Sequence, residues 1–589
     1  MNLRIYTADD TRTAMGPWAE RLATCSLLDD ARRNLYRAVT DAQYTALNLE
    51  EPGPSAHVIR DCARALRSML AARSDRLAGI SATQALLDVA AGRPRGDLGP
   101  GFHAEMTHIW MGLRGEVRPA QFVPGPDPDS EGGDKMTSEL GHLWEAAANY
   151  TARYEDGLSP EAVARRQERK AEILQATGGT EADWQSWEWQ ARHAFGRVRE
   201  VEAAVALTDS ERQGLEAAEE SRLPFSVTPY YASLMDKVPG HRDRSIRAQV
   251  FPSVPVAHAW GVTLEQAGRE SMDYMGEGLT SPVPLVTRRY PSIAVLKPFN
   301  ACPQLCVYCQ RNWEICGVMS PEALAPWEQI ENALWWIESN PAITELLITG
   351  GDPLGMSDAL LERLLKRVAA IKHIDVVRIG TRTPVTVPMR ITERLADIIS
   401  RVREPGTREV MVVTHIQHPY EVTPELVQAV DRLRSRGIGV YNQLVYTFYV
   451  SRRFEATSLR MLLRRAGVDP YYTFVAKAKP ELRGYRVPLA RLLQEQKEEV
   501  RLLPGTRRTD EAVYNIPRLG KSHIRAAQHR DLIGVGPDGA RIYEFHPWEK
   551  NITPREPHVG ADVPIYEYLQ RLAAIGENLR DYHTIWYYF

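Results

Sequence analysis

Cysteine is scarce in this chain, and long apolar runs are missing. Six cysteines occur in 589 residues, and half of them lie close together, at Cys302, Cys306 and Cys309. Such clustering is typical of a metal site rather than of a disulfide framework, and it indicates a reducing compartment. The sequence has no run of about 20 apolar residues and no secretory-type N-terminus. We therefore expect a cytoplasmic protein with no membrane partner.

The chain also has little net charge. Its 72 lysines and arginines nearly balance 75 aspartates and glutamates, which leaves a formal charge of −3. A balance of this kind gives no electrostatic signal for nucleic acid, so we expect no nucleic-acid partner. A chain of 589 residues is long enough for two or more domains.

Helical periodicity covers most of the first half of the chain. Apolar residues recur there at spacings of three and four, which predicts helices. We expect a helical N-terminal extension over residues 1–123, to which we assign no chemistry, and a helical arm before the catalytic unit over 136–285. The segment PGPDPDSEGGDK at 124–135 can neither hold a helix nor pack apolar surface, so it is the predicted linker.

Short β-rich runs alternate with helical stretches in the second half. These runs are IAVLKPF, ELLIT, VVRIG, VMVVT, IGVYNQLVY and YYTFV. Repeated βα units predict a parallel sheet with right-handed crossovers, either doubly wound or a complete or partial (β/α) barrel. In both folds, ligands bind at the carboxyl ends of the strands. We place this α/β unit at 286–480 and a C-terminal region at 481–589.

The three clustered cysteines follow the first of these strands, with the spacing C-x3-C-x2-C. Three thiolates can hold a [4Fe-4S] cluster and leave one iron without a protein ligand. That open iron would bind the amino and carboxylate groups of S-adenosylmethionine (SAM), and electron transfer would then generate a 5′-deoxyadenosyl radical. Two alternatives remain open: a zinc loop with Cys316 as fourth ligand, or cysteines that bind no metal.

A Gly-Gly turn follows the second strand in the segment LLITGGDPL. Gly350 and Gly351 would allow the backbone to approach a ligand closely, as binding of the SAM amino group requires. A Gly-Gly turn alone is weak evidence, but its place one strand after the cysteines supports the SAM interpretation. We include Asp352 of this turn among the cofactor-binding candidates.

Together these segments resemble the lysine 2,3-aminomutase family of radical SAM, pyridoxal phosphate (PLP) dependent enzymes. The resemblance covers about 184–550 and includes DWQSWEWQARHAF, TPYYASLMD, RRYP, RIGTRTPVTVPMRIT, THIQHPYEVTPE, GIGVYNQ and NIPRLGKSH. It implies a partial (β/α) radical SAM barrel. It also implies an isomerase that moves an α-amino group to the neighbouring carbon.

The resemblance also implies roles for individual residues. Lys521 matches the lysine that binds PLP covalently, although its loop is shorter and poorer in glycine than is usual in the family. Arg289 and Tyr290 match a pair near the PLP phosphate, but Ile293 stands where a second phosphate arginine is expected. Arg289 could therefore be an ordinary surface cation.

Three further matches concern SAM and the substrate. Arg311 matches the arginine that binds the substrate α-carboxylate, for which a planar bidentate donor is suited. His415 and Gln443 match polar residues at strand ends beside SAM or the substrate. Each of these could instead be a polar group with a purely structural role.

The substrate prediction depends on two departures from lysine-specific members. Lys477 and Asn515 stand where those members carry the two carboxylates that bind the distal ammonium. A positive and a neutral group cannot neutralise a lysine side chain, but they suit a distal carboxylate. The pair resembles glutamate 2,3-aminomutases, so we expect conversion of L-glutamate to β-glutamate. Alternatively, Lys479 is the true counterpart, or Lys477 points to solvent.

Other functions stay open on the sequence alone. An enzyme of the same fold could act on lysine or on a protein-bound lysine. Alternatively, the protein is not an enzyme but a sensor that binds an iron–sulfur cluster or SAM. As partners we expect a small amino-acid substrate and an electron donor such as flavodoxin or ferredoxin. A homo-oligomer is expected from the Trp-rich region, which resembles an intersubunit arm of the family.

Overall fold

The computed structural model describes residues 3–48, 55–93, 95–117, 133–315, 317–517, 519–548 and 556–589. Most of the predicted linker, at 124–132, and Cys316 lie outside the described residues. The linker prediction is wrong at its last three residues, because 133–135 form the start of helix α8. The helical pattern that follows this segment extends backward by about one turn.

The N-terminal extension is helical, as the periodicity predicted. Its helices are α1 (Ala8–Met15), α2 (Pro17–Ala23), α3 (Leu28–Leu47), α4 (Ala56–Met69), α5 (Ala72–Ala78), α6 (Ala82–Ala90) and α7 (Pro100–Leu113). The buried face of α4 carries Cys62, Leu66 and Met69 at helical spacing. These helices therefore share one apolar core.

The region before the catalytic sheet is also helical. It contains α8 (Gly133–Thr151), α9 (Pro160–Thr177), α10 (Glu181–Trp184), α11 (Trp187–Arg192), α12 (Val198–Ala204), α13 (Asp209–Glu220), α14 (Pro229–Ala232), α15 (Arg244–Arg247), α16 (Val254–Ala267), and the 3-10 helices η1 (Arg269–Met272) and η2 (Gly278–Thr280). Local signals set several boundaries: Thr208 and Glu211 form a capping box at α13, and Gly178 ends α9 in the left-handed conformation.

A nine-stranded sheet in the order β1-β2-β3-β4-β5-β6-β7-β8-β9 carries the site. Its strands are β1 (Val286–Tyr290), β2 (Ile293–Phe299), β3 (Glu345–Gly350), β4 (Val376–Gly380), β5 (Glu409–Thr414), β6 (Gly439–Tyr446), β7 (Asp469–Val475), β8 (Glu511–Ile516) and β9 (Gly520–His523). Strands β2 to β8 are parallel, and β1 and β9 are antiparallel at the edges. The strands lie side by side in the same order as in the sequence, as in a partial (β/α) barrel. All six strands predicted from the sequence, β2 to β7, are confirmed.

Amphipathic helices connect the parallel strands. They are α17 (Trp327–Glu338), α18 (Asp358–Ala369), α20 (Glu393–Ser400), α21 (Pro424–Arg434), α22 (Glu455–Arg465) and α23 (Leu489–Glu498), with the short α19 (Thr383–Thr386) after β4. In α18 the buried residues Leu361, Leu364, Leu365 and Val368 form one stripe. Such stripes cover the sheet and leave its carboxyl edge for the loops that carry polar residues.

The sheet extends beyond residue 480, so the predicted end of the barrel unit there is wrong. The chain returns through α23 and adds β8 parallel to β7, and the short hairpin β8–β9 then completes the sheet. Strand β9 has only four residues, too few to give a clear alternating pattern. This hairpin carries both Asn515 and Lys521, so the edge of the sheet belongs to the site.

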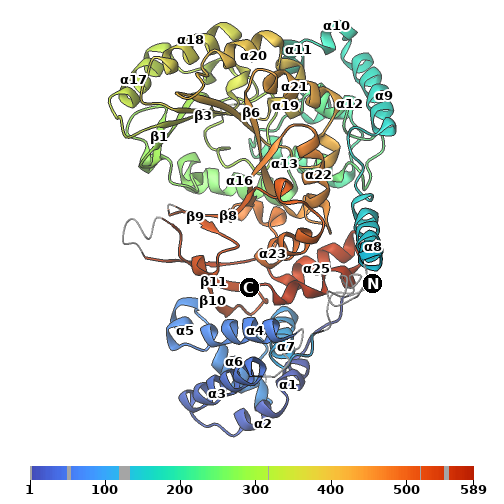
Figure 1. Cartoon of the computed structure of the whole chain (residues 1–589), viewed down its shortest axis with the longest axis vertical. Helices are drawn as coiled ribbons and strands as arrows, with labels where there is room; N and C mark the ends of the chain where they lie inside the picture. Colours follow the sequence, from blue (N-terminus) through green and yellow to red (C-terminus); the bar gives the residue numbers. More distant parts are fainter. Residues whose placement is uncertain are drawn as a thin grey trace.

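A second, three-stranded sheet joins the N-terminal extension to the rest of the molecule. It contains β10 (Arg530–Val535), β11 (Arg541–Phe545) and β12 (His558–Ala561), followed by α25 (Ile565–Ala574) and η12 (Leu579–Tyr587). Figure 1 shows α1–α7 at one end of the molecule against β10, β11 and α25, and the nine-stranded sheet at the other. Buried Glu105 accepts bonds from Arg541 across this junction. Among the described helices, none is both long and apolar enough to cross a membrane.

Candidate functional site

A cavity of about 530 Å³ lies at the carboxyl edge of the nine-stranded sheet. Its lining includes all fourteen residues singled out from the sequence: Arg289, Tyr290, Cys302, Cys306, Cys309, Arg311, Gly350, Gly351, Asp352, His415, Gln443, Lys477, Asn515 and Lys521. They come from β1, the end of β3, strand β6, the loops after β2, β3, β5 and β7, and the β8–β9 hairpin. The structure therefore brings the candidates for the cluster, SAM, PLP and substrate into one chamber.

The three cysteines lie on the loop after β2, and their chemistry fits a cluster. Burial raises the pKa of Cys309 to about 11 and that of Cys302 well above its ordinary value. Such thiols become thiolates when a metal binds and displaces their protons. Among the described residues, no three His, Cys, Asp or Glu side chains converge to bind a single metal ion. Three cysteine thiolates on one loop match the protein ligand set of a [4Fe-4S] cluster that leaves one iron open.

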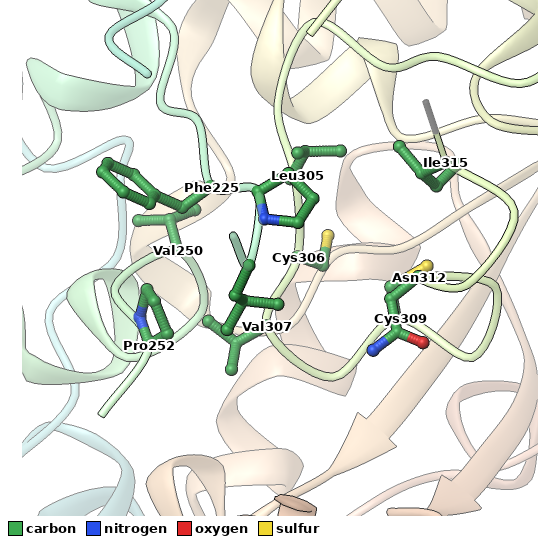
Figure 2. Close-up of a pocket in the computed structure, with 11 residues that line it drawn as sticks. Phe225, Val250, Pro252, Leu305, Cys306, Val307, Cys309, Asn312 and Ile315 are labelled. Carbon is green, nitrogen blue, oxygen red and sulfur yellow. The ribbon is translucent and has the colours of Figure 1, made fainter. Parts of the chain in front are cut away.

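An apolar crevice lies on the other flank of the cysteine loop. Figure 2 shows Phe225, Val250 and Pro252 on one side of the crevice and the loop with Cys306 and Cys309 on the other. The crevice is narrow, so these apolar side chains pack closely against the loop. The cysteine loop thus lies between the chamber and this apolar crevice.

The Gly-Gly turn packs directly against the cysteine loop. Gly350 has φ +118°, and a Cβ on Gly351 would lie only 2.3 Å from the carbonyl oxygen of Ala301. Larger residues are therefore excluded by the chain's own backbone next to Cys302. These glycines thus allow close packing of backbone on backbone within the protein, and their predicted approach to SAM stays a prediction.

Asp352 uses its carboxylate within the protein. It accepts bonds from Thr381 Oγ1 at 2.6 Å and from the backbone amides of Arg382 and Thr383 at 2.9 and 3.1 Å. Burial raises the pKa of Asp352, which these donors oppose. The residue therefore ties the turn after β3 to the end of β4, and direct binding of SAM by its side chain stays a prediction.

Lys521 lies in an aromatic enclosure at the sheet edge. Its Nζ donates to Tyr290 Oη at 3.1 Å and lies 4.8, 5.6 and 5.0 Å from the ring centres of Tyr290, Tyr472 and Trp548. An amine held among aromatic faces suits covalent binding of an aromatic aldehyde such as PLP. Arg289 lines the same wall and donates to the carbonyl of Met275. The predicted PLP residues are therefore close together.

Arg311 lies in the chamber, but the structure gives it a partner that the sequence analysis did not identify. Its Nε and Nη2 atoms donate to the two carboxylate oxygens of Glu277 at 3.0 and 2.9 Å. Burial would raise the pKa of Glu277, but Arg311, Lys297 and Lys477 together hold it below its ordinary value. Glu277 is thus an ionised carboxylate that orients Arg311. Only its place in the loop MGEGL, before the RRYP segment, could have drawn attention to it.

Lys477, not Lys479, faces the chamber. Lys479 does not line it, and its Nζ donates to Asn312 at 2.9 Å instead. Lys477 lies near Met275 Sδ at 3.5 Å, and burial followed by the charge of Lys521 lowers its pKa well below the ordinary value. Asn515 is paired across the hairpin with Lys521. The lining favours Lys477 over Lys479 as the residue that faces the chamber, and its contact with the substrate stays a prediction.

His415 and Gln443 meet at the ends of neighbouring strands. His415 Nδ1 lies 3.1 Å from the carbonyl oxygen of Gln443, and burial with the nearby Arg382 lowers the pKa of His415 to about 4. The imidazole is therefore neutral near pH 7 and can take part in the chamber as a neutral donor or acceptor.

The fold and this chamber define a radical SAM enzyme. A model of the Radical SAM superfamily matches residues 296–451, which span the cysteine loop and β2–β6. An uncharacterised KamA family protein of Methanocaldococcus jannaschii is 39% identical over 88% of this chain and 86% of its own length. The chain therefore belongs to the KamA family.

Two relatives with named activities match the sheet region. L-lysine 2,3-aminomutase of Clostridium subterminale is 32% identical over 53% of this chain and 71% of its own length. Glutamate 2,3-aminomutase of Clostridioides difficile is 32% identical over 52% of this chain and 69% of its own length. Membership of the superfamily implies a [4Fe-4S] cluster and SAM, and KamA-family aminomutases use PLP.

Proposed function

We propose that this protein is a radical SAM, PLP-dependent 2,3-aminomutase that converts L-glutamate to β-glutamate. Relatives named as lysine and glutamate 2,3-aminomutases support the reaction class, since both are 32% identical to this chain. One chamber that contains the cysteine triplet, Arg311 and Lys521 supports the cofactor set. A sensor of SAM or iron would need neither Arg311 nor Lys521.

The substrate proposal depends on the burial and the charge of Lys477. Within the part of the chain that the structure describes, Arg311 pairs with Glu277, whereas Lys477 forms no ion pair. Burial makes the protonated ammonium of Lys477 costly even with Glu277 nearby, and a substrate carboxylate would stabilise it. The free ammonium of lysine would meet a like charge there instead.

The chain's own residues would then bind and orient the substrate. Arg311, held by Glu277, presents its remaining N–H edge to the α-carboxylate, and Lys477 with Asn515 binds the distal carboxylate. PLP on Lys521 would supply a π-system through which the amino nitrogen can pass between neighbouring carbons. The aromatic wall around Lys521 excludes water from that reaction.

The test uses anaerobically reconstituted, reduced protein with SAM and PLP. It is incubated with L-glutamate and, separately, with L-lysine, and α- and β-amino acids are resolved by chromatography. β-Glutamate formed only by protein with Lys521 intact is the expected result. β-Lysine would overturn the substrate proposal, and release of 5′-deoxyadenosine without either product would indicate another amino acid or a protein-bound lysine.

A pH dependence of substrate binding follows from Lys477. Burial holds the pKa of Lys477 well below its ordinary value in the free enzyme. The protonated form, which binds a carboxylate, is therefore lost as the pH rises through this lowered pKa. Above it, KM for glutamate should rise by about tenfold per pH unit. The measurement is KM as a function of pH.

Two variants separate this effect from other titrations. Lys477→Met should remove the pH dependence and lower kcat/KM for glutamate by about 10- to 100-fold at low pH, as expected for a hydrogen bond to a charged group. Lys479→Met, which lies outside the chamber, should keep the wild-type profile. An unchanged profile in Lys477→Met would contradict the assignment.

Glu277 should affect substrate binding through Arg311. We expect Glu277→Gln to raise KM by about 10- to 100-fold, because one charged hydrogen bond contributes about 1.5–3 kcal/mol. Gln310→Ala is the control, since Gln310 carries no charge and donates a single long bond to Glu277, at 3.3 Å. Steady-state kinetics on both variants should show a much smaller change for Gln310→Ala, and equal changes would count against a role for the Glu277 charge.

The proposal includes partners outside the chain. One is an external one-electron donor such as flavodoxin or ferredoxin, because the cluster must be reduced before it can cleave SAM. We also propose a homo-oligomer through the Trp-rich helices α10 and α11, and a cytoplasmic location.

A further inference from the structure

A buried arginine contacts one of the cluster cysteines. Arg382 follows β4 in the segment RIGTRTPV and is 8% exposed. Its Nη1 atom lies 2.8 Å from Cys306 Sγ, and its Nε donates to the carbonyl oxygen of His415 at 3.3 Å. Its backbone amide also donates to Asp352. Arg382 thus lies between the cysteine loop and the turn after β3.

An anionic network holds the guanidinium in place. Arg382 Nη2 donates to Glu421 at 2.8 Å and to Gln249, and Tyr231 Oη donates to the same Glu421 carboxylate at 2.6 Å. Tyr308, from the cysteine loop, donates to Gln249 at 3.0 Å. These partners come from four separate parts of the chain and fix one orientation, in which Nη1 points at Cys306.

We infer that Arg382 sets the reduction potential of the cluster through its charge and its hydrogen bond to the Cys306 thiolate, and that Glu421 moderates this effect. Reduction adds one electron from an external donor to the cluster and so adds negative charge. A cation that donates to a ligand sulfur stabilises this charge, most strongly where water is excluded. Arg382 is therefore a positioning and tuning residue, and its role does not depend on the identity of the amino-acid substrate.

The sign of the effect distinguishes this role from a purely structural one. Without the guanidinium the reduced cluster loses stabilisation, so Arg382→Gln should lower the potential. Without the Glu421 charge the guanidinium acts uncompensated, so Glu421→Gln should raise it. General damage to the packing gives no reason for opposite shifts, although both residues are buried.

The experiment is a dithionite titration of anaerobically reconstituted full-length protein, followed by the electron paramagnetic resonance signal of the reduced cluster. The expected shift in Arg382→Gln is at least about tenfold in the ratio of reduced to oxidised cluster at a fixed potential, which is about 59 mV for one electron. Arg382→Lys, which keeps the positive charge, should shift the reduction potential less than Arg382→Gln does.

Arg378 provides a matched control. It is a buried arginine on β4, the strand that Arg382 follows, and lines the same chamber, but it bonds to Tyr471 and Glu345 and contacts none of the described cysteines. Arg378→Gln should leave the potential unchanged. Equal potentials in wild type and Arg382→Gln would overturn the inference. If Arg382→Gln does not retain iron, Glu421→Gln decides: an upward shift supports the inference, and no shift or a downward shift overturns it.

Discussion

Lys521→Ala is expected to lose covalently bound PLP and to form no β-amino acid above background. The physical reason is that no other lysine amine is placed in the aromatic enclosure of Tyr290, Tyr472 and Trp548 among the described residues. Because the cofactor supplies the route for the nitrogen, its loss should cost at least three orders of magnitude in rate, about 4 kcal/mol of transition-state stabilisation. Reduction of the holoenzyme with borohydride and mass spectrometry of its peptides locates the modified lysine.

Two variants serve as controls for this prediction. Lys521→Arg keeps the positive charge beside the rings but cannot bind an aldehyde covalently, so it should be as inactive as Lys521→Ala. Lys366→Ala removes an exposed lysine on α18 and should leave both labelling and activity unchanged. Labelling of a different lysine in the wild-type protein would show that the assignment is wrong.

Cys306→Ala is expected to lose the [4Fe-4S] cluster and all reductive cleavage of SAM. Cys306 is one of three thiols on a single loop, and a cluster with two remaining protein ligands is poorly held. Since the radical arises only through this cluster, aminomutase activity should also fall to background. Iron and sulfide content, the absorbance of the reconstituted protein and release of 5′-deoxyadenosine measure the loss.

The chain contains a suitable cysteine control. Cys25 lies in the loop between α2 and α3, where it donates to the carbonyl oxygen of Arg21 and accepts from Asn34 Nδ2. Cys25→Ala should keep wild-type iron content and SAM cleavage. A wild-type iron content in Cys306→Ala would mean that the cluster is bound elsewhere, and the interpretation of the triplet would fail.

The sequence by itself determined the features that depend on short stretches of chain. Strands β2 to β7 were predictable because each buried strand is a compact apolar run between polar turns. The cysteine triplet and the pair Gly350–Gly351 were predictable for a similar reason. The ligands of one cluster and the residues of a tight turn lie within a few positions of one another in the sequence. The matched segments then pointed to Lys521, Arg289, Arg311, Lys477 and Asn515, which all line one chamber.

Only the tertiary structure decided which charged residues face one another. Glu277 and Arg311 are 34 positions apart, and Cys306 and Arg382 are 76 apart, so no periodicity relates them. Their contacts depend on how loops from different strands meet at one edge of the sheet. The same holds for Trp548 beside Lys521, and for the choice of Lys477 over Lys479, which follows from the direction in which the chain leaves β7. The secondary-structure preferences of short segments do not determine such pairings, because burial and charge compensation arise only after the sheet has assembled.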